Sequence, residues 1–376
     1  MTSPRTTTTG KRRASRSVPV AALLLVLALV AAACGDDSDD AGTTPSSEAP
    51  AGSSGSSTDD AKDEEEDADP TGEEAFGKVI KVGGPIGGAP AVKAAVDQGF
   101  FEEEGLEVEY QQLSGGPEAL TATIGGSVDV AYCDIFAWVG SLANGFDTQL
   151  LQAANGPGGG STVLARPGSG IEEPKDLEGK KLAIIALPLS RVQANIWLES
   201  SGVDPDKVEL VSVTQRDTMG AITSQGQVDA TMISDPYSPI WQDEYGLEPI
   251  GEIVDGKLPA DATIAAYLVR GDWAEKNPVT AERFVRAIRK GADFLNNATP
   301  EEKAELKLKW DKLDLFALDE KTPGVLANFH DSIYRDGPLD LEDTNEWLET
   351  GLKYGAIEKL VDIEPHLAPV GQKATL

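Results

Sequence analysis

The chain has 376 residues, with 63 acidic side chains against 32 basic ones, so its net charge is −31 at pH 7. A surface this acidic repels a phosphate backbone, which argues against nucleic acid as a partner. Its two cysteines, Cys34 and Cys133, offer no disulfide framework, and its two histidines, His330 and His366, are too far apart to suggest a metal site. We therefore expect no metal and no cofactor.

The N-terminus has the pattern of a secretory signal over residues 1–33. A basic segment, Lys11–Arg16, precedes an apolar run, Val18–Ala33, that is shorter than the roughly 20 residues of a membrane-spanning helix. Residues 32–35, AACG, resemble the bacterial lipobox, which implies cleavage before Cys34 and a lipid on its sulfur. The alternative is a plain signal peptide with an incidental cysteine. In both cases we expect an extracytoplasmic protein, and the lipobox adds a lipid anchor in the bacterial cell membrane.

Residues 34–76 are expected to form a disordered tether. Within them, the stretch 35–74 has 15 acidic residues, one lysine and no aromatic residue. Such a segment buries too little apolar surface to offset its ordering entropy, and charge repulsion extends it. The folded part then begins at residue 77, and its 300 residues exceed what one core usually supports, so we expect two lobes.

The folded part opens with a strand, a glycine-rich loop, a helix and a second strand over Lys78–Leu113. The loop GGPIGGAP contains Gly83, Gly84 and Gly87 and leads into a helix N-terminus, where bare amides and the helix dipole favour a ligand. The alternative is an ordinary turn that needs glycine only for its backbone angles. Strands and helices continue to alternate up to Ile233, which predicts α/β layers around mostly parallel sheets. From Trp273 onward the pattern is helical, over Val279–Leu295, Glu301–Trp310, Pro323–Tyr334 and Asp343–Tyr354.

An internal repeat places two aspartates at similar corners. Residues 123–134 read TIGGSVDVAYCD and residues 223–235 read TSQGQVDATMISD, each ending on an aspartate after an apolar strand. Ligands of open α/β sheets bind outside the carboxyl ends of strands, so Asp134 and Asp235 are expected to face one another across a cleft. The alternative is that both aspartates only cap helices.

An ordered set of motifs resembles the solute-binding proteins of ABC importers, in the branch for nitrate, sulfonate, taurine and thiamine-pyrimidine precursors. The motifs are GGPIGGAP, AAVDQGFFEEEGLEVE, GGSVDVAYCD, DLEGKKLAI, SGVDPDKVELVSV and GQVDA. The resemblance implies a two-lobed type II periplasmic-binding-protein clamshell, in which each lobe is a mostly parallel sheet flanked by helices and a helical C-terminal tail rejoins the first lobe. It places lobe 1 at residues 77–164 and 268–376, and lobe 2 at residues 165–267.

The resemblance also implies a function and a set of site residues. The protein would be a monomer that captures a small organic solute by hinge closure and delivers it to a membrane permease with its ATPase. Residues expected to line the cleft are Gly83, Gly84, Gly87, Tyr132, Asp134, Asn155, Pro188, Ser190, Arg191, Asp217, Asp235 and Tyr237. Among them, Pro188 and Ser190 would bring a helix N-terminus to an anionic group. A sulfonate, a taurine-like zwitterion and an amine-bearing heterocycle all remain open as ligands.

Two other functions fit the same fold. A receptor module for a membrane sensor would use the same closure and have the same sequence features. A thiamine-pyrimidine synthase would need a histidine and a cysteine-rich motif. Residues 1–329 contain no histidine, and Cys133 stands alone at the position of that motif, so we expect no enzyme.

Overall fold

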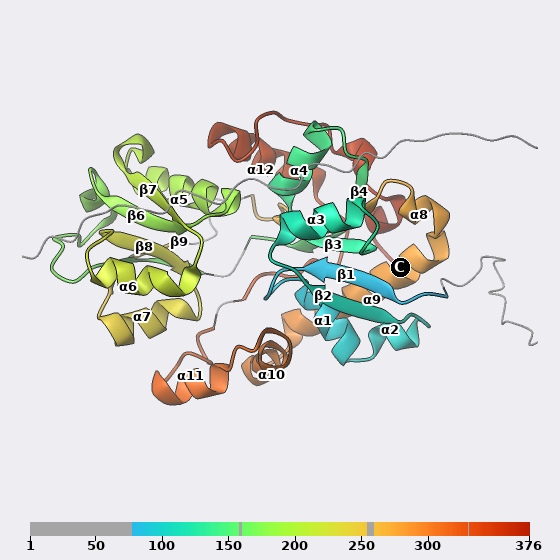
Figure 1. The fold of residues 1–376 in the computed structure, drawn as a ribbon, viewed down its shortest axis with the longest axis horizontal. Helices are drawn as coiled ribbons and strands as arrows, with labels where there is room; N and C mark the ends of the chain where they lie inside the picture. Colours follow the sequence, from blue (N-terminus) through green and yellow to red (C-terminus); the bar gives the residue numbers. More distant parts are fainter. Residues whose placement is uncertain (1–76, 158–159, 254–258, 330) are drawn as a thin grey trace, which may run out of the picture. The chain divides into compact units, whose positions relative to one another are not determined.

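The computed structural model describes residues 77–157, 160–253, 259–329 and 331–376. The expected signal peptide, the tether and Cys34 lie outside these ranges. Within them, no helix is both long and apolar enough to cross a membrane. Two five-stranded sheets organise the described part of the chain, and helices pack on both of them (Figure 1).

The first sheet has the strand order β2-β1-β3-β10-β4. Its strands are β1 Ile80–Gly84, β2 Val108–Gln112, β3 Val130–Asp134, β4 Thr148–Asn155 and β10 Ala265–Arg270. Strand β1 pairs in parallel with β2 and β3, whereas β10 is antiparallel to both of its neighbours, β3 and β4. Four strands therefore share one direction, as expected, and the odd strand is the one that arrives from the second sheet.

The second sheet repeats this arrangement with the order β7-β6-β8-β5-β9. Its strands are β5 Ser161–Ala165, β6 Lys181–Ile185, β7 Glu209–Val213, β8 Ala230–Ser234 and β9 Glu248–Ile253. Here β5, the first strand after the chain leaves the first sheet, is the antiparallel one. Each sheet thus receives one strand from a crossing connection.

The crossings fall a few residues earlier than the boundaries expected from the sequence. All of β5 pairs within the second sheet, so the first change of sheet lies between Asn155 and Ser161 rather than after residue 164. All of β10 pairs within the first sheet, so the return precedes Ala265 rather than residue 268. Apolar periodicity cannot locate these points, because the same kind of apolar run forms a strand in either sheet.

Helices cover both faces of each sheet. The helices are α1 Pro90–Asp97, α2 Phe100–Glu103, α3 Gly116–Ile124, α4 Ile135–Ala143, α5 Pro188–Ser200, α6 Met219–Ser224, α7 Tyr237–Tyr245, α8 Trp273–Lys276, α9 Pro278–Asn297, α10 Pro300–Asp311, α11 Leu315–Lys321 and α12 Leu341–Lys353. In the second sheet, Leu182 and Ile184 of β6 pack with Trp197 of α5, while Ala183 packs with Trp241 of α7 on the other face. This alternation is what a strand buried on both faces requires.

The first sheet is buried in the same way. One face packs on α1 and α9, with Val82, Val92 and Phe284 in one cluster. The other face packs on α3, α4 and α12, with Trp138 and Trp347 fully buried. Because α9 and α12 follow β10 in the chain, the helical tail does rejoin the first sheet.

One expected helix of the tail, Pro323–Tyr334, is wrong. The helix of this region is α11, which ends at Lys321, and the chain then turns. The carboxylate of Asp319 accepts from the amides of both Gly324 and Leu326, and Gly324 has a φ of +96°, which holds the segment out of the helical conformation. Tyr334 instead forms an antiparallel bridge with Asn155 of β4.

The internal repeat has a structural cause in two further aspartates. The amide of Asp129 donates to the carbonyl of Lys81 over 2.8 Å, and its carboxylate accepts from the Lys81 amide over 2.9 Å. Asp229 makes the same two bonds with Lys181, over 3.0 Å and 2.9 Å. Each Val-Asp pair of the repeat therefore ties the start of one strand to the start of its parallel neighbour.

This match shows that Asp134 and Asp235 are not equivalent. If Asp129 and Asp229 are taken as equivalent, the counterpart of Asp134 is Ser234. Each is the last residue of its strand, β3 or β8. Asp134 pairs with Ala265 of β10 and Ser234 pairs with Ser161 of β5, again at corresponding ends. The second copy of the motif is one residue longer, so alignment by the final aspartate was misleading.

Candidate functional site

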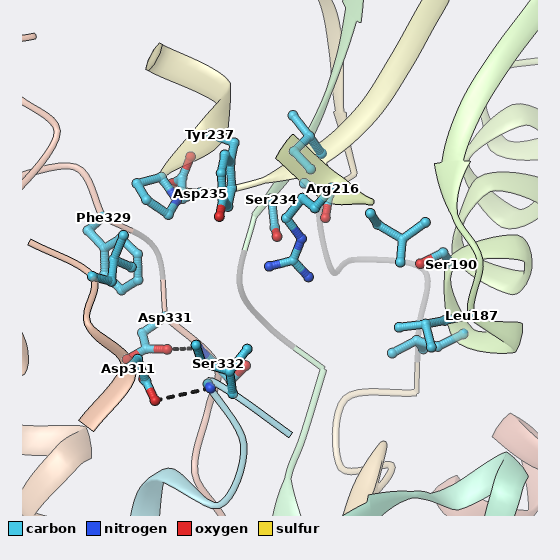
Figure 2. A pocket seen from close by; sticks show the side chains of 18 of the residues that line it. Leu187, Ser190, Arg216, Ser234, Asp235, Tyr237, Asp311, Phe329, Asp331 and Ser332 are labelled. Carbon is cyan, nitrogen blue, oxygen red and sulfur yellow. Dashed lines mark hydrogen bonds between the residues drawn. The ribbon is translucent and has the colours of Figure 1, made fainter. Parts of the chain in front are cut away.

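A cavity of about 460 Å³ lies among segments from both sheets and from the tail (Figure 2). Its volume is within the range usual for small-molecule sites. Its second-sheet side comes from the segments after β6 and β8, with Arg216 between β7 and α6. The opposite side comes from the loop after β1 and from residues 307–332 of the tail. The cavity therefore lies where ligands of α/β sheets bind, outside the carboxyl ends of strands.

The N-terminus of α5 reaches the cavity through Leu187, Leu189 and Ser190. Leu187 is the N-cap and supplies no side-chain hydrogen bond, and Pro188 occupies the first helical position. The amides of the first turn are thus left without a side-chain cap, at the positive end of a 13-residue helix. Such an end favours an anionic group. Leu187 is 46% exposed, which gives the cavity an apolar edge beside these amides.

Arg216 supplies a cation to the same side of the cavity. It begins the short 3-10 turn Arg216–Thr218, which directly precedes the first residue of α6. Its guanidinium carbon lies 5.6 Å from the centre of the Tyr237 ring, and that ring packs in turn on Trp241, with centroids 5.6 Å apart. The stacking orients the guanidinium without using its hydrogen-bond donors. Figure 2 shows the group reaching into the cavity from the side opposite Asp311 and Asp331.

Asp235 and Ser234 line the cavity beside Tyr237. Helix α7 begins at Tyr237 with Pro236 as its N-cap, so Asp235 stands one residue before the cap position. Asp134, in contrast, is itself the N-cap of α4, and its carboxylate accepts from the Ala137 amide over 2.9 Å. Of the two corners expected on opposite walls, only that of Asp235 lines this cavity.

The tail side of the cavity is rich in charge. Lys307, Asp311, Lys312 and Asp331 line it together with Phe329 and Ser332. Asp311 accepts from the Lys93 ammonium over 2.6 Å and from the Gly87 amide over 3.0 Å, which fixes α10 to the loop after β1. Lys307 lies 3.8 Å from Asp331 and 5.0 Å from the centre of the Phe329 ring.

Four of the residues expected from the sequence meet at this cavity: Gly87, Ser190, Asp235 and Tyr237. The others lie outside its lining: Gly83, Gly84, Tyr132, Asp134, Asn155, Pro188, Arg191 and Asp217. Gly83 and Gly84 belong to β1 itself, and a Cβ at Gly84 would meet Tyr110 and Tyr132. The Tyr132 hydroxyl donates to the Asn155 side chain over 2.8 Å, and burial raises the pKa of Tyr132, so this pair joins β3 to β4.

Sequence reasoning did not find the tail residues. Lys307, Asp311, Phe329 and Asp331 fall in a region whose only visible signal was helical periodicity. A weak signal was present in the charges, because Lys307 and Asp311 lie one turn apart on α10. Among the described residues, no group of three or more histidine, cysteine or acidic side chains could hold a metal ion.

Comparison with known proteins gives consistent matches. The family model described as NMT1/THI5 like matches residues 91–303. The taurine-binding periplasmic protein of Escherichia coli K12 is 22% identical over 199 residues, which cover 53% of this chain and 60% of that protein. The 4-amino-5-hydroxymethyl-2-methylpyrimidine phosphate synthase THI13 of Saccharomyces cerevisiae is 24% identical over 214 residues, which cover 54% of this chain and 61% of that one.

A solved structure shares the arrangement of the two sheets. The periplasmic aliphatic sulphonate binding protein SsuA of Escherichia coli superposes with a TM-score of 0.62 at 20% identity, covering 77% of this chain and 97% of that one. This likeness confirms the expected α/β fold with two lobes, and the family match confirms the resemblance drawn from the ordered motifs. The chain therefore belongs to the NMT1/THI5-like family and has the two-lobed fold of the periplasmic binding proteins.

Proposed function

We propose that this protein is the extracytoplasmic solute-binding component of an ABC importer, and that it captures a small organic solute carrying an oxyanion. The observation that carries the proposal is the meeting of Arg216 with the uncapped N-terminus of α5 in one cavity. A guanidinium and bare helix amides both provide donors suited to a sulfonate or carboxylate. The named substrates of the bacterial relatives, taurine and aliphatic sulphonates, carry such a group.

The rest of the cavity suits an organic body rather than a bare inorganic ion. Ile86 and Leu187 are 57% and 46% exposed and both line it, together with Tyr237 and Phe329. Apolar and aromatic walls with a few polar groups are typical of sites for small organic molecules. Nitrate, which has no apolar part, would leave these side chains in water.

Binding would proceed by closure of the two lobes around the solute, with no covalent chemistry. The bound solute would then pass to a permease driven by its ATPase. A diacylglycerol on Cys34 would hold the protein at the membrane, with residues 34–76 as the tether. We also propose that the protein acts as a monomer.

A thermal-shift screen of the purified protein tests this function. The screen should contain alkanesulfonates, taurine, nitrate, pyrimidines and polyamines. A ligand present at 100 times its Kd stabilises by about 2.7 kcal/mol. We expect stabilisation by sulfonates, recovery of the ligand unchanged, and a smaller radius in X-ray scattering. Turnover of the ligand would instead favour an enzyme, in line with the similarity to the yeast synthase. Stabilisation by polyamines alone would contradict the proposal that the ligand carries an oxyanion.

The partner needs a separate measurement. A sensor receptor would bind the same ligand, so ligand binding does not distinguish it from an importer subunit. If a permease and its ATPase are encoded beside this protein, stimulation of that ATPase by the liganded protein would support import. Loss of solute uptake in cells that lack the protein would support import as well.

A further inference from the structure

The tail side of the cavity differs in chemistry from the side of Arg216. Residues 307–332 supply Lys307, Asp311, Lys312, Phe329, Asp331 and Ser332 to the lining. The match to the family model ends at residue 303, before this wall begins. A group on the ligand that contacts this wall would be recognised separately from the oxyanion.

Lys307 and Asp331 form an incomplete ion pair. Their side chains are only 17% and 13% exposed, yet the nitrogen and oxygen are 3.8 Å apart. Hydrogen bonds between such groups are shorter, at about 2.7–2.9 Å. One oxygen of Asp331 accepts from the Ser332 amide over 3.0 Å, and the other lies 3.8 Å from Lys307, so Lys307 and this second oxygen line the cavity without a direct bond between them. Asp311, the other acid of this wall, is bonded at 2.6 Å to Lys93 and is already satisfied.

The pair presents one donor and one acceptor side by side, with no net charge. An ion of either sign placed there would be attracted by one member of the pair and repelled by the other, so the pair gives it little net stabilisation. An uncharged group with an adjacent acceptor and donor, such as a carboxamide, bonds to both. Phe329, over whose ring Lys307 lies at 5.0 Å, also lines the cavity and adds an apolar contact beside the pair.

We infer that Lys307 and Asp331 form a specificity subsite for an uncharged amide-like group, at the end of the ligand opposite its oxyanion. This inference rests on the proposed function, because Arg216 and α5 must hold the oxyanion. The ligand class is then an organic oxyanion with a carboxamide, urea or amino-carbonyl heterocycle at its far end.

Three probes of matched length test the subsite by calorimetry. They are 3-sulfopropanamide, its isosteric hydrocarbon 3-methylbutane-1-sulfonate, and the zwitterion 3-aminopropane-1-sulfonate. The wild-type protein should bind the amide about 10-fold more tightly than the hydrocarbon, since a hydrogen bond to a charged group gives that much discrimination. The zwitterion should bind less tightly than the amide.

Variants locate the discrimination. The double substitution Lys307→Met with Asp331→Asn should bring the amide and the hydrocarbon within about 2-fold of each other. As a control, Lys309→Met removes a positive charge from the same helix. Lys309 is 61% exposed, pairs with Asp97 and lies outside the cavity, so this variant should keep the preference. Thermal unfolding of each variant checks that it is folded.

Each remaining outcome has a definite meaning. Binding of all three probes by the wild type with similar affinity would overturn the subsite and leave the oxyanion proposal intact. An amide preference that survives in the double variant would also overturn it. Failure of all three sulfonates to bind would overturn the proposed function and the subsite together.

Discussion

The ammonium of Lys93 on α1 lies 2.6 Å from the carboxylate of Asp311 at the end of α10, and both side chains are largely buried. Burial lowers the pKa of Lys93, while the bond to Asp311 acts in the opposite direction. The Asp311 carboxylate also accepts from the Gly87 amide, and the ammonium lies 4.5 Å from the centre of the Tyr110 ring. This cluster joins the loop after β1 to the tail, and so connects two parts of the cavity lining.

Removing one partner of this pair should destabilise the protein strongly. Asp311→Asn leaves the Lys93 ammonium buried without its anion. Such a change typically lowers the free energy of unfolding by about 3–5 kcal/mol. Urea denaturation measures the loss. Adding Lys93→Met to Asp311→Asn should recover much of it, because the uncompensated charge is gone. The exposed pair Lys276–Asp272 is the control, and Lys276→Met should change stability by less than about 0.5 kcal/mol. Equal effects in the buried and exposed pairs would contradict this role.

Asp134 should make stability depend on pH. Burial raises the pKa of Asp134 above its usual 3.8, although the Ala137 amide bonds to the carboxylate. The folded state therefore holds the proton more tightly than the unfolded state does, and stability falls as pH rises from about 3.8 through the raised pKa. Asparagine caps a helix about as well as aspartate. Asp134→Asn should consequently be more stable than the wild type at pH 7, and the difference should vanish near pH 3.

A second cap serves as the control for this prediction. Asp340 is exposed, caps α12 and accepts from the Asp343 amide over 2.8 Å. Asp340→Asn should show no comparable gain at pH 7, because water already solvates its carboxylate. Denaturant midpoints for both variants at pH 3, 5 and 7 provide the comparison. A gain that is the same at every pH would show that removal of a buried charge is not its cause.

Two glycines with opposite surroundings test the packing of the first lobe. A Cβ at Gly291 of α9 would collide with the backbone carbonyl of Ala91 in α1, which cannot rotate away. Gly291→Ala should therefore destabilise by about 1–3 kcal/mol through overpacking. At Gly140 of α4 a Cβ would have no atom within 4 Å apart from the backbone of its own helix, so Gly140→Ala should stabilise by roughly 0.5–1 kcal/mol. Thermal unfolding distinguishes the two variants. If both substitutions stabilise the protein, α1 and α9 are packed less closely than the contact at Gly291 implies.

The order of strands and helices could be predicted because its signals are local. Gly99 and Gly145, for example, follow helices at positive φ, and the apolar run of β6 lies between turns. On the second-sheet side of the cavity, three residues implied by the resemblance line it: Asp235 and Tyr237 closely follow β8, and Ser190 lies in the first turn of the helix after β6. Such residues are placed by the short chain connection itself.

The other side of the cavity could not be predicted from local signals. Asp331 reaches the cavity because turns after α11 bring the segment back to earlier parts of the chain, where Tyr334 bridges to Asn155 and Asp331 pairs with Lys307. Gly83 and Gly84 looked like a ligand loop, but β1 pairs with β2 as far as Gly84, so of the three glycines expected to contact ligand only Gly87 lies beyond the strand. Tertiary contacts decided both cases, and a single sequence does not contain them.

The lipid anchor is a prediction from sequence alone. If Cys34 carries a diacylglycerol, Cys34→Ser should abolish lipid labelling and release the protein from membranes, because nothing else in the tether would hold a bilayer. Fractionation after a salt wash and metabolic labelling measure the two effects. Cys133 is the matched control. It is buried, and burial raises the pKa of its thiol, so Cys133→Ser should leave the labelling unchanged. Membrane association that persists in Cys34→Ser would contradict the lipid anchor.

Arg216 and Arg191 provide the sharpest test of the binding site, because sequence and structure favour different arginines. Arg191 follows the α5 N-terminus directly but lies outside the cavity lining, whereas Arg216 comes from a separate turn and stacks on Tyr237 inside it. Arg216→Ala should weaken sulfonate binding by about 10- to 100-fold, the usual effect of losing a charge-assisted hydrogen bond. Arg191→Ala should weaken it by less than about 2-fold. Both variants remove one positive charge, so long-range attraction changes equally and only direct contact distinguishes them. Calorimetry at constant ionic strength gives the two affinities. A larger loss of affinity in Arg191→Ala would show that the oxyanion binds further along α5, away from Arg216. The lobes would then close on a different part of this cavity.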